Sequence, residues 1–292
     1  MIRSPGTIFL NGRFLQSSRA MVPIDDRGLL FGDGLFETFC AYNGRVYLLN
    51  RHLKRLRSSA GALNIHFPSD LESAGELIAE LCKRNRLIGA RVRITLTRGK
   101  FQGGLTLEND GGHTLFVSAA GLPRQQIDFE ARRKSVWKAK LTNRRTGPLA
   151  AHKTISYMHC LAAQSEALLS GCDQAIMRDN KGRPVEGATA NLFAVRGGGI
   201  FTPSVRQGCL PGVIRGRVIE IARRLGVPLG IKPLGVKGLS EADEVFMTNA
   251  VAYLVPVVRI DDRKIGNGGA GPIASMLRDV LLEEVSAATA SR

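Results

Sequence analysis

The chain has 292 residues, with 41 Lys and Arg against 25 Asp and Glu, and so a formal net charge of +16. This length suits one large domain or two ordinary ones, and the composition, 44% hydrophobic and 23% charged, is that of a globular protein and excludes a disordered chain. No run of 18 apolar residues is present, which excludes a membrane-spanning helix, and the first six residues lack the apolar core of a secretory signal. We therefore expect a cytoplasmic protein.

The five cysteines and five histidines form no metal-binding or disulfide pattern. The cysteine count is odd and no CxxC pair occurs, which argues against a disulfide framework and a structural zinc site. Cys82 and Cys160 lie in apolar-periodic stretches, so we expect both in the core. No HxH or HExxH spacing is present either. These patterns predict no bound metal and a reducing environment.

The stretch from Leu122 to Pro148 is strongly basic. Its basic residues are Arg124, Arg132, Arg133, Lys134, Lys138, Lys140, Arg144 and Arg145. One interpretation is a nucleic-acid groove with Trp137 as a stacking platform. The other is a solvated basic face on a protein that handles carboxylates and phosphates. We favour the second, because nucleic-acid modules usually combine basic residues with several aromatic ones, and aromatics make up only 6% of this chain.

The first part of the chain is predicted to be a small α+β domain, residues 1–121. Asn-Gly turns at Asn11 and Asn43 lie between apolar pairs, which is a strong hairpin signal. Apolar residues then follow a helical spacing twice. The expected elements are strands 7–10, 13–15, 36–42, 45–49, 90–97 and 114–119, and helices 50–63 and 70–83. Two helices against an antiparallel sheet make an α+β fold.

The polar, Pro-containing segment 122–128 is the expected linker, followed by a larger domain of strands and helices, residues 129–292. Gly171 and Gly226 follow two helical patterns, as C-cap glycines do. The expected elements are helices 155–170, 212–225 and 273–285, and strands 174–179, 183–187, 191–195, 200–203, 244–248 and 254–260.

Three short motifs could carry chemistry, although each alone is as easily an ordinary solvated or capping residue. Lys153 lies where a loop becomes a helix, and a lysine desolvated there becomes nucleophilic enough for an imine; Tyr157 follows one turn later. Glu186 ends a strand before small residues, where a buried carboxylate needs a cationic partner. Gly212, Val213 and Ile214 open a helix, whose N-terminus favours a phosphate. Together these are the groups that pyridoxal phosphate demands.

Further motifs along nearly the whole chain make a family resemblance specific. They are Asp25-Asp26-Arg27-Gly28, the stretch from Phe31 to Thr38, Arg51 to Leu56, and Asp243 to Ala250, in order with Lys153, Glu186 and Gly212. In these motifs the chain resembles the class-IV aminotransferase family of fold-type IV enzymes, which comprises branched-chain and D-amino-acid aminotransferases and aminodeoxychorismate lyases. The resemblance implies a two-domain α+β fold, with pyridoxal 5'-phosphate in the cleft between a small N-terminal and a larger C-terminal domain, and a homodimer.

The same resemblance implies a role for each matching residue. Lys153 should form the imine with the cofactor and move a proton between the substrate α-carbon and the cofactor, and Glu186 should keep the ring nitrogen protonated. Arg55 should bind the phosphate together with the backbone N–H groups of Val213 and Ile214. The remaining cofactor contacts are expected from Leu210 against the ring, Tyr157 at the phenolic oxygen, and Asn249.

The substrate-binding residues are less uniform, because the chain departs from each subfamily somewhere. Phe36 and Thr38 are expected near the substrate, and Arg98 matches an arginine that D-amino-acid enzymes use for a carboxylate, although Lys100 stands where those enzymes have histidine. Arg93, with Arg91 on the same strand face, would suit a dicarboxylate. Ala250 lacks the hydroxyl that branched-chain and D-amino-acid enzymes place on the phosphate.

We therefore predict an aminotransferase that exchanges an amino group between an amino acid, of branched-chain or D-amino-acid type, and a 2-oxo acid. The alternative is an aminodeoxychorismate lyase that releases 4-aminobenzoate and pyruvate, because Thr38 and Asn249-Ala250 are closer to that subfamily. A basic nucleic-acid-binding protein on an inactive scaffold is a third possibility, disfavoured because Lys153, Glu186 and Arg55 are all present.

Overall fold

The computed structural model describes residues 6–101, 103–104, 106–108, 112–147 and 149–290, so the N-terminal residues 1–5 used in the signal-peptide argument lie outside the described part. The chain forms two compact units. The first comprises Met1–Ile127, His152–Ser156 and Val285–Arg292, and the second comprises Asp128–Ala151 and Tyr157–Glu284. The expected linker includes a short helix, α4 (Arg124–Ile127). The predicted boundaries of independent domains stay a prediction.

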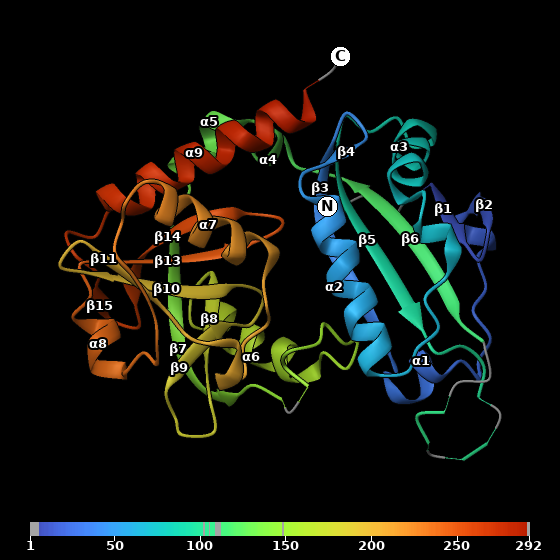
Figure 1. Cartoon of the computed structure of the whole chain (residues 1–292), viewed down its shortest axis with the longest axis horizontal. Coiled ribbons are helices and arrows are strands. Elements are labelled where there is room, and N and C mark those ends of the chain that lie inside the picture. Colours follow the sequence, from blue (N-terminus) through green and yellow to red (C-terminus); the bar gives the residue numbers. More distant parts are fainter. Residues whose placement is uncertain (1–5, 102, 105, 109–111, 148, 291–292) are drawn as a thin grey trace. The chain divides into compact units, whose positions relative to one another are not determined.

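The first unit is built on a six-stranded sheet in which every strand pair is antiparallel, in the order β2-β1-β6-β5-β3-β4 (Figure 1). The strands are β1 (Thr7–Leu10), β2 (Arg13–Gln16), β3 (Gly34–Tyr42), β4 (Arg45–Val46), β5 (Gly89–Thr97) and β6 (Thr114–Gly121), and the helices are α1 (Arg27–Phe31), α2 (Leu49–Ala62), α3 (Ala74–Arg84) and α4. The Asn-Gly hairpin at Asn11 is confirmed, with both turn residues at positive φ.

Strand β4 is much shorter than the predicted strand 45–49. Leu48 adopts a left-handed backbone, with φ of 56°, and α2 begins at Leu49. Strand β4 pairs only with Ala41 and Tyr42, and in this register even the predicted strand 45–49 would reach only Thr38, so β4 does not cover the edge of β3 near Gly34. A distant segment covers it instead: Phe36 N donates to Lys153 O at 2.9 Å, and Ile155 N donates to Gly34 O at 3.0 Å.

The second unit has a nine-stranded mixed sheet whose main path is β12-β11-β10-β13-β14-β7-β8-β9 (Figure 1). Its strands are β7 (Trp137–Arg145), β8 (Gln174–Arg178), β9 (Pro184–Gly187), β10 (Asn191–Arg196), β11 (Gly199–Thr202), β12 (Leu229–Ile231), β13 (Glu244–Asn249), β14 (Tyr253–Ile260) and β15 (Arg263–Lys264). Its helices are α5 (Phe129–Lys134), α6 (Met158–Leu169), α7 (Val213–Arg224), α8 (Val236–Ser240) and α9 (Pro272–Thr289), the last of which ends in the first unit.

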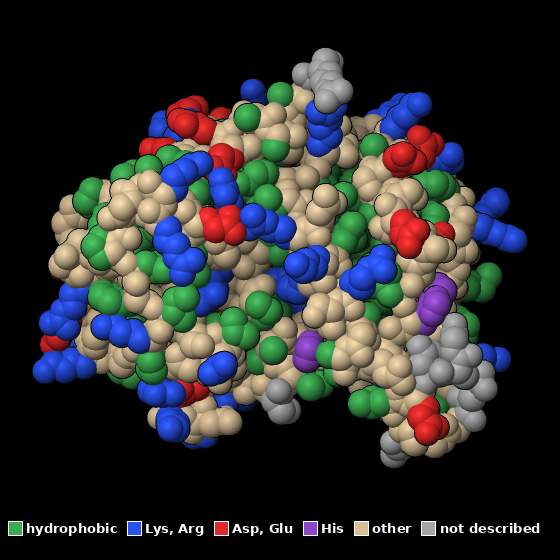
Figure 2. Space-filling view, in the orientation of Figure 1, with side chains coloured by type: hydrophobic (Ala, Val, Ile, Leu, Met, Phe, Trp, Pro, Cys, Tyr) green, Lys and Arg blue, Asp and Glu red, His purple; other side chains and the backbone are tan. Residues whose placement is uncertain are grey.

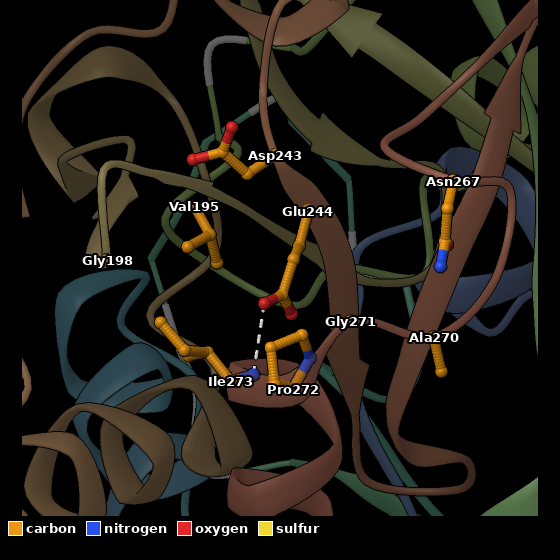
Figure 3. Close-up of a pocket in the computed structure, with 9 residues that line it drawn as sticks. All are labelled: Val195, Gly198, Asp243, Glu244, Asn267, Ala270, Gly271, Pro272 and Ile273. Carbon is orange, nitrogen blue, oxygen red and sulfur yellow. Dashed lines mark hydrogen bonds between the residues drawn. The ribbon is translucent and has the colours of Figure 1, made fainter.

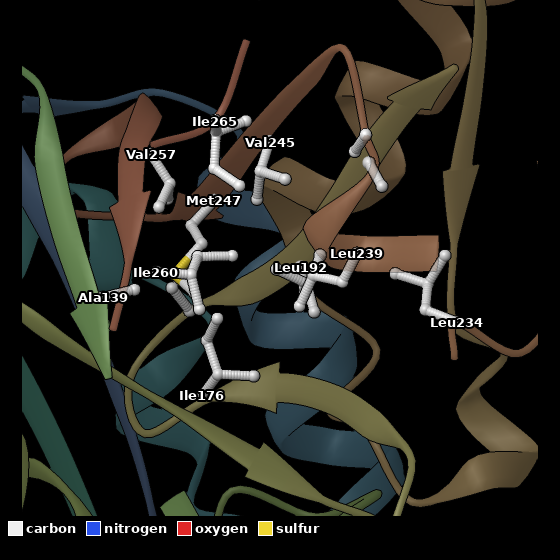
Figure 4. Packing of buried hydrophobic residues seen from close by; sticks show 13 residues of the cluster. Ala139, Ile176, Leu192, Leu234, Leu239, Val245, Met247, Val257, Ile260 and Ile265 are labelled. Atoms are coloured by element: carbon white, nitrogen blue, oxygen red, sulfur yellow. The ribbon is translucent and has the colours of Figure 1, made fainter. Parts of the chain in front are cut away.

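One face of this sheet carries a dry apolar cluster (Figure 4). Leu192 of β10 and Met247 of β13 lie in it, both fully buried. Because side chains alternate along a strand, their neighbours Asn191 and Thr248 point to the opposite face. Helix α7 packs against β13 on the second unit. Asn191 and Thr248 thus lie on the face away from the cluster.

Three predictions of secondary structure were wrong in detail. The helix expected from Asp70 starts at Ala74, after a 3-10 turn, and the helix expected from Ile155 starts at Met158. In the second case Lys153 to Ile155 are extended residues hydrogen-bonded to β3. The basic stretch around Trp137 forms a strand, β7, that the sequence analysis did not predict. Cys82 and Cys160 are buried as predicted, and all five cysteines are free and buried.

Candidate active site

Lys153 lies beside Phe36 on the first unit. The backbone bonds to β3 fix its position, and its Nζ lies 4.3 Å from the centre of the Phe36 ring. Arg93 of β5 places its guanidinium carbon 3.9 Å from the same ring centre and donates from Nε to Thr95 Oγ1 at 3.1 Å. Thr38 pairs across strands with Arg93 and is therefore on the same sheet face. The structure thus brings Lys153 and Arg93 to the ring of Phe36, with Thr38 on the same sheet face as Arg93.

Arg55 is held by a buried carboxylate that the sequence analysis missed. Its Nε and Nη2 donate to Glu37 Oε1 and Oε2 at 2.8 and 2.6 Å, a bidentate pair. His52 Nδ1 lies 2.8 Å from Glu37 Oε2. Glu37 and His52 are each 1% exposed. The signals were a charged residue inside the apolar run of β3, and the i,i+3 spacing of His52 and Arg55 on one helix face.

Burial fixes the charges of this trio. Desolvation alone would raise the pKa of Glu37, but Arg55 and His52 outweigh it and lower the value to about 2. Desolvation also lowers the pKa of His52, and the charges of Arg55 and Lys153 act in the same direction. The imidazole is therefore neutral at neutral pH and donates its Nδ1 proton to the ionised Glu37, which can only accept. The guanidinium of Arg55 is thus held in place by the ionised carboxylate of Glu37, which His52 also contacts.

Arg98 does not fit its predicted role as a carboxylate-binding residue. The side chain is 2% exposed, and five hydrogen bonds account for its five N–H groups. Two go to Asp33, and three go to the carbonyl oxygens of Leu63, Asn64 and Leu107. We withdraw this assignment, because Arg98 ties the end of α2 and the β5–β6 loop to β3 and has no donor left for a substrate.

The second unit holds the residues predicted to bind the ring. Glu186 Oε2 accepts a hydrogen bond from Leu210 N at 2.9 Å, and Asn191 Nδ2 donates to Leu210 O at 2.8 Å. The Leu210 backbone is thus fixed on both sides, which orients the carboxylate of Glu186 and the Leu210 side chain. A Cβ on Gly212 would lie 1.9 Å from Asn191 Oδ1, so glycine is required where the chain passes Asn191 and enters α7.

Helix α7 begins with an anion-binding geometry. Its N-cap is Gly212, which supplies no side-chain acceptor for the first N–H groups, and Val213 and Ile214 follow directly. On the neighbouring strand, the hydroxyl of Thr248 is buried and has no hydrogen-bond partner among the described residues. A phosphate supplies acceptors for both kinds of donor. The residues of the second unit therefore fit the phosphate and ring nitrogen of pyridoxal phosphate, which Glu186, Val213 and Ile214 would hold as predicted.

Two further predicted cofactor residues are engaged within the protein. Tyr157 donates its hydroxyl proton to Ala188 O at 2.9 Å. Asn249 Oδ1 accepts from Val251 N and Ala252 N, at 2.9 and 2.7 Å, and so shapes the turn between β13 and β14. Their assignments as cofactor contacts stay predictions.

A pocket of about 420 Å³ on the second unit is lined by none of these residues (Figure 3). Glu244 occupies its wall and accepts from Ile273 N and Ala274 N at 3.0 and 2.8 Å, which caps α9. The carboxylate would overlap any Cβ on Gly271. Glu244 is therefore engaged in capping α9, and the pocket is not part of the candidate site.

The basic side chains do not form one continuous patch on the face that Figure 2 shows. On the face shown in Figure 2, Lys and Arg side chains are scattered among neutral and hydrophobic ones. Several arginines of the basic stretch are paired within the protein, Arg133 with Asp279 and Arg144 with Glu166. These contacts favour the solvated-face interpretation over a nucleic-acid groove. No helix in the described part of the chain is long and apolar enough to cross a membrane.

Comparison with known proteins agrees with this geometry. Residues 34–260 match the family described as Amino-transferase class IV. A protein of Methanocaldococcus jannaschii described as a putative branched-chain-amino-acid aminotransferase is 36% identical, over 93% of this chain and 94% of its own length. The D-alanine aminotransferase of Listeria monocytogenes is 26% identical, over 96% of each chain.

A solved structure extends the likeness to three dimensions. The T.th. branched-chain amino acid aminotransferase, complexed with N-(5'-phosphopyridoxyl)-L-glutamate, superposes with a TM-score of 0.86 at 30% identity, and the match covers 100% of this chain and 96% of that one. This confirms the expected α+β fold with a small antiparallel N-terminal sheet and a larger C-terminal part.

We predict that Glu37→Gln will lower the free energy of unfolding by about 3 kcal/mol at pH 7. The Arg55 side chain, which is only 10% exposed, would then lack its negatively charged partner. The folded pKa of about 2 lies below the ordinary 4.5, so the stabilisation is complete above pH 4.5 and is lost as the pH falls through 2. Urea unfolding across this range should show the loss in wild type and a smaller loss in the variant. Glu80→Gln, which removes an exposed ion pair with Arg84, is the control and should change little; an equal effect of both would contradict the buried role of Glu37.

Proposed function

The chain belongs to the class IV aminotransferase family and is a pyridoxal-phosphate-dependent aminotransferase, and we propose that it exchanges an amino group between branched-chain amino acids and a dicarboxylic 2-oxo acid. The predictions of family, enzyme class and cofactor are confirmed. When bound, pyridoxal phosphate supplies a reactive carbonyl and an electron-withdrawing ring. The protein supplies the lysine, the charges and the orientation.

The observation that carries the proposed acceptor is the arrangement around Phe36. Lys153 Nζ and the Arg93 guanidinium carbon both lie within 4.3 Å of the centre of this ring. A substrate whose α-carbon reacts at Lys153 therefore has a guanidinium nearby for a second carboxylate, which arginine binds in a bidentate manner. The glutamate adduct in the T.th. aminotransferase supports a dicarboxylic partner. The name of the M. jannaschii relative supports branched-chain amino acids as the other partner.

We assign the remaining steps to residues whose surroundings suit them. Lys153, fixed through its backbone, holds and returns the proton at the substrate α-carbon. Glu186, already an acceptor for Leu210 N, stabilises a protonated ring nitrogen. On the second unit the start of α7 holds the phosphate. On the first unit Arg55 stays a predicted phosphate-binding residue, and Thr38, half-buried beside Arg93, contacts the substrate.

A panel of amino donors tests the function. Branched-chain L-amino acids with 2-oxoglutarate should give glutamate, while D-alanine and the other D-amino acids should react much more slowly. The lyase alternative predicts instead release of 4-aminobenzoate and pyruvate from aminodeoxychorismate, with no requirement for a 2-oxo acid. Faster turnover of D-amino acids, or 4-aminobenzoate release without amino exchange, would overturn the proposal.

Arg93→Gln should raise the KM for glutamate and 2-oxoglutarate by roughly ten- to a hundredfold, the range for losing a charge-assisted pair of about 1.5–3 kcal/mol. The KM for a branched-chain amino acid should change little, because no second carboxylate is present. Arg45→Gln, at an exposed position on β4 of the same sheet, is the control. Equal effects of the Arg93 change on mono- and dicarboxylic substrates would contradict this role.

We also propose a homodimer. The segment 20–31 exposes several large apolar side chains, with Met21 82%, Ile24 81% and Leu29 68% exposed, more than a monomer usually leaves in contact with water. A second copy that covers this segment would remove them from solvent. Light scattering should give twice the 31.6 kDa chain mass, and Ile24→Lys should shift it toward the monomer. Ile88→Lys, at an isolated exposed position, should not; a monomeric wild type would contradict the proposal.

The five cysteines are buried and form no disulfide, which supports the predicted cytoplasmic location.

A further inference from the structure

Thr248 carries a hydroxyl whose burial is unexplained by the fold. The residue is 1% exposed, and its Oγ1 has no hydrogen-bond partner among the described residues. Its backbone is fully engaged in the sheet, because β13 pairs with β10 on one side and with β14 on the other. An unpaired hydroxyl taken out of water costs free energy that a valine of the same shape would not. Such a group in a native protein calls for a partner that binds from outside.

The register of the strands shows where this hydroxyl points. Thr248 lies directly opposite Asn191, so both side chains are on one face of the sheet, with Cβ atoms about 5 Å apart. The amide of Asn191 reaches Leu210 O at 2.8 Å, and its Oδ1 lies where a Cβ on Gly212 would be. Met247, the preceding residue, points the other way into the apolar cluster of Figure 4. The Thr248 hydroxyl therefore points to the side where the chain enters α7.

The start of α7 provides the complementary half of a binding site. The helix is 12 residues long and its N-cap glycine offers no side-chain oxygen to the first N–H groups. These donors and the helix dipole favour an anion with several acceptor oxygens. Val213 and Ile214 are buried, so a ligand held here exchanges few contacts with water.

We propose that the Thr248 hydroxyl donates a hydrogen bond to the phosphate group of the cofactor, beside the N–H groups that open α7. The inference deepens the proposed function and rests on the phosphate being held at Val213 and Ile214. It adds a side-chain donor from β13 to a site otherwise formed by the backbone. The hydroxyl that is costly in the empty protein is satisfied when the phosphate binds.

Equilibrium binding to the protein freed of cofactor tests this role without any measurement of turnover. Thr248→Val keeps the shape and removes the hydroxyl, and should weaken pyridoxal phosphate by roughly ten- to a hundredfold, the range for one hydrogen bond to a charged group. Pyridoxal, which lacks the phosphate, should bind wild type and variant alike. Thr248→Ser should retain affinity for pyridoxal phosphate close to that of wild type. Inorganic phosphate should raise the Tm of the wild-type protein and raise it less in Thr248→Val.

The stability of the empty protein gives a second, independent readout. Thr248→Val should raise the Tm by about 2 °C or more, because an unsatisfied buried hydroxyl is removed. Thr142→Val is the matched control: Thr142 is equally buried but donates to Ile176 O at 3.1 Å, so its loss should lower the Tm and leave the preference for pyridoxal phosphate over pyridoxal unchanged.

These measurements distinguish a wrong assignment of Thr248 from a wrong proposed function. If wild type binds pyridoxal phosphate and Thr248→Val binds it equally well, the Thr248 assignment is wrong and the proposed function stands. A lower Tm of Thr248→Val without cofactor would show that the hydroxyl already has a partner, which also overturns the assignment. If wild type binds neither pyridoxal phosphate nor phosphate, the proposed function fails and the assignment falls with it.

Discussion

The open edge of β3 is the constraint on which the first half of the site depends. Strand β4 stops where Leu48 turns the chain into α2 in a left-handed conformation, and its register places it along the other end of β3, so the backbone near Gly34 has no partner from β4. A buried strand cannot leave these groups unpaired, and Lys153 and Ile155 provide the partners. Lys153 is thus placed by hydrogen bonds between its backbone segment and β3, and its side chain lies beside Phe36.

Alternation along β3 then separates two tasks. Glu37 points toward α2, where it fixes Arg55, and the neighbouring Phe36 and Thr38 point to the face that carries Arg93. Glu37 keeps its charge at every pH of interest because its pKa is about 2. One nine-residue strand therefore fixes Arg55 through Glu37 on one face and presents Phe36 and Thr38 on the other. On the second unit, the Leu210 backbone orients two side chains in a similar way: its N–H donates to Glu186, and its carbonyl oxygen accepts from Asn191.

Local signals predicted the parts of the fold that depend on local interactions. The Asn-Gly turns, α7 and the hairpin before Glu186 follow from turn chemistry and helical spacing. Long-range pairing overrode such signals where the predicted helix 155–170 lost its first turn to β3. Strand β7 was missed although Trp137, Ala139 and Leu141 alternate with Lys138 and Lys140, because the basic residues were interpreted only as a charged surface.

The same distinction explains which site residues could be predicted. Lys153 and Glu186 were predicted as site residues because family motifs mark them. Arg98 was misassigned because its five bonds go to residues far away in the sequence, with Asp33 65 positions distant, which no local pattern reveals. Glu37 and Thr248 were missed because a buried carboxylate and an unpaired hydroxyl are properties of packing. The structure identifies Glu37 through its hydrogen bonds to Arg55. It identifies Thr248 because the hydroxyl has no hydrogen-bond partner among the described residues.

The central claim is that Lys153 is the residue that binds the cofactor covalently and moves the proton. Borohydride reduction of the protein loaded with pyridoxal phosphate, followed by peptide mass analysis, tests it directly. The account predicts one pyridoxyl-modified peptide, the one that contains Lys153, and its disappearance in Lys153→Arg. Modification of a different lysine in the wild type, or an unchanged pattern in the variant, would contradict it.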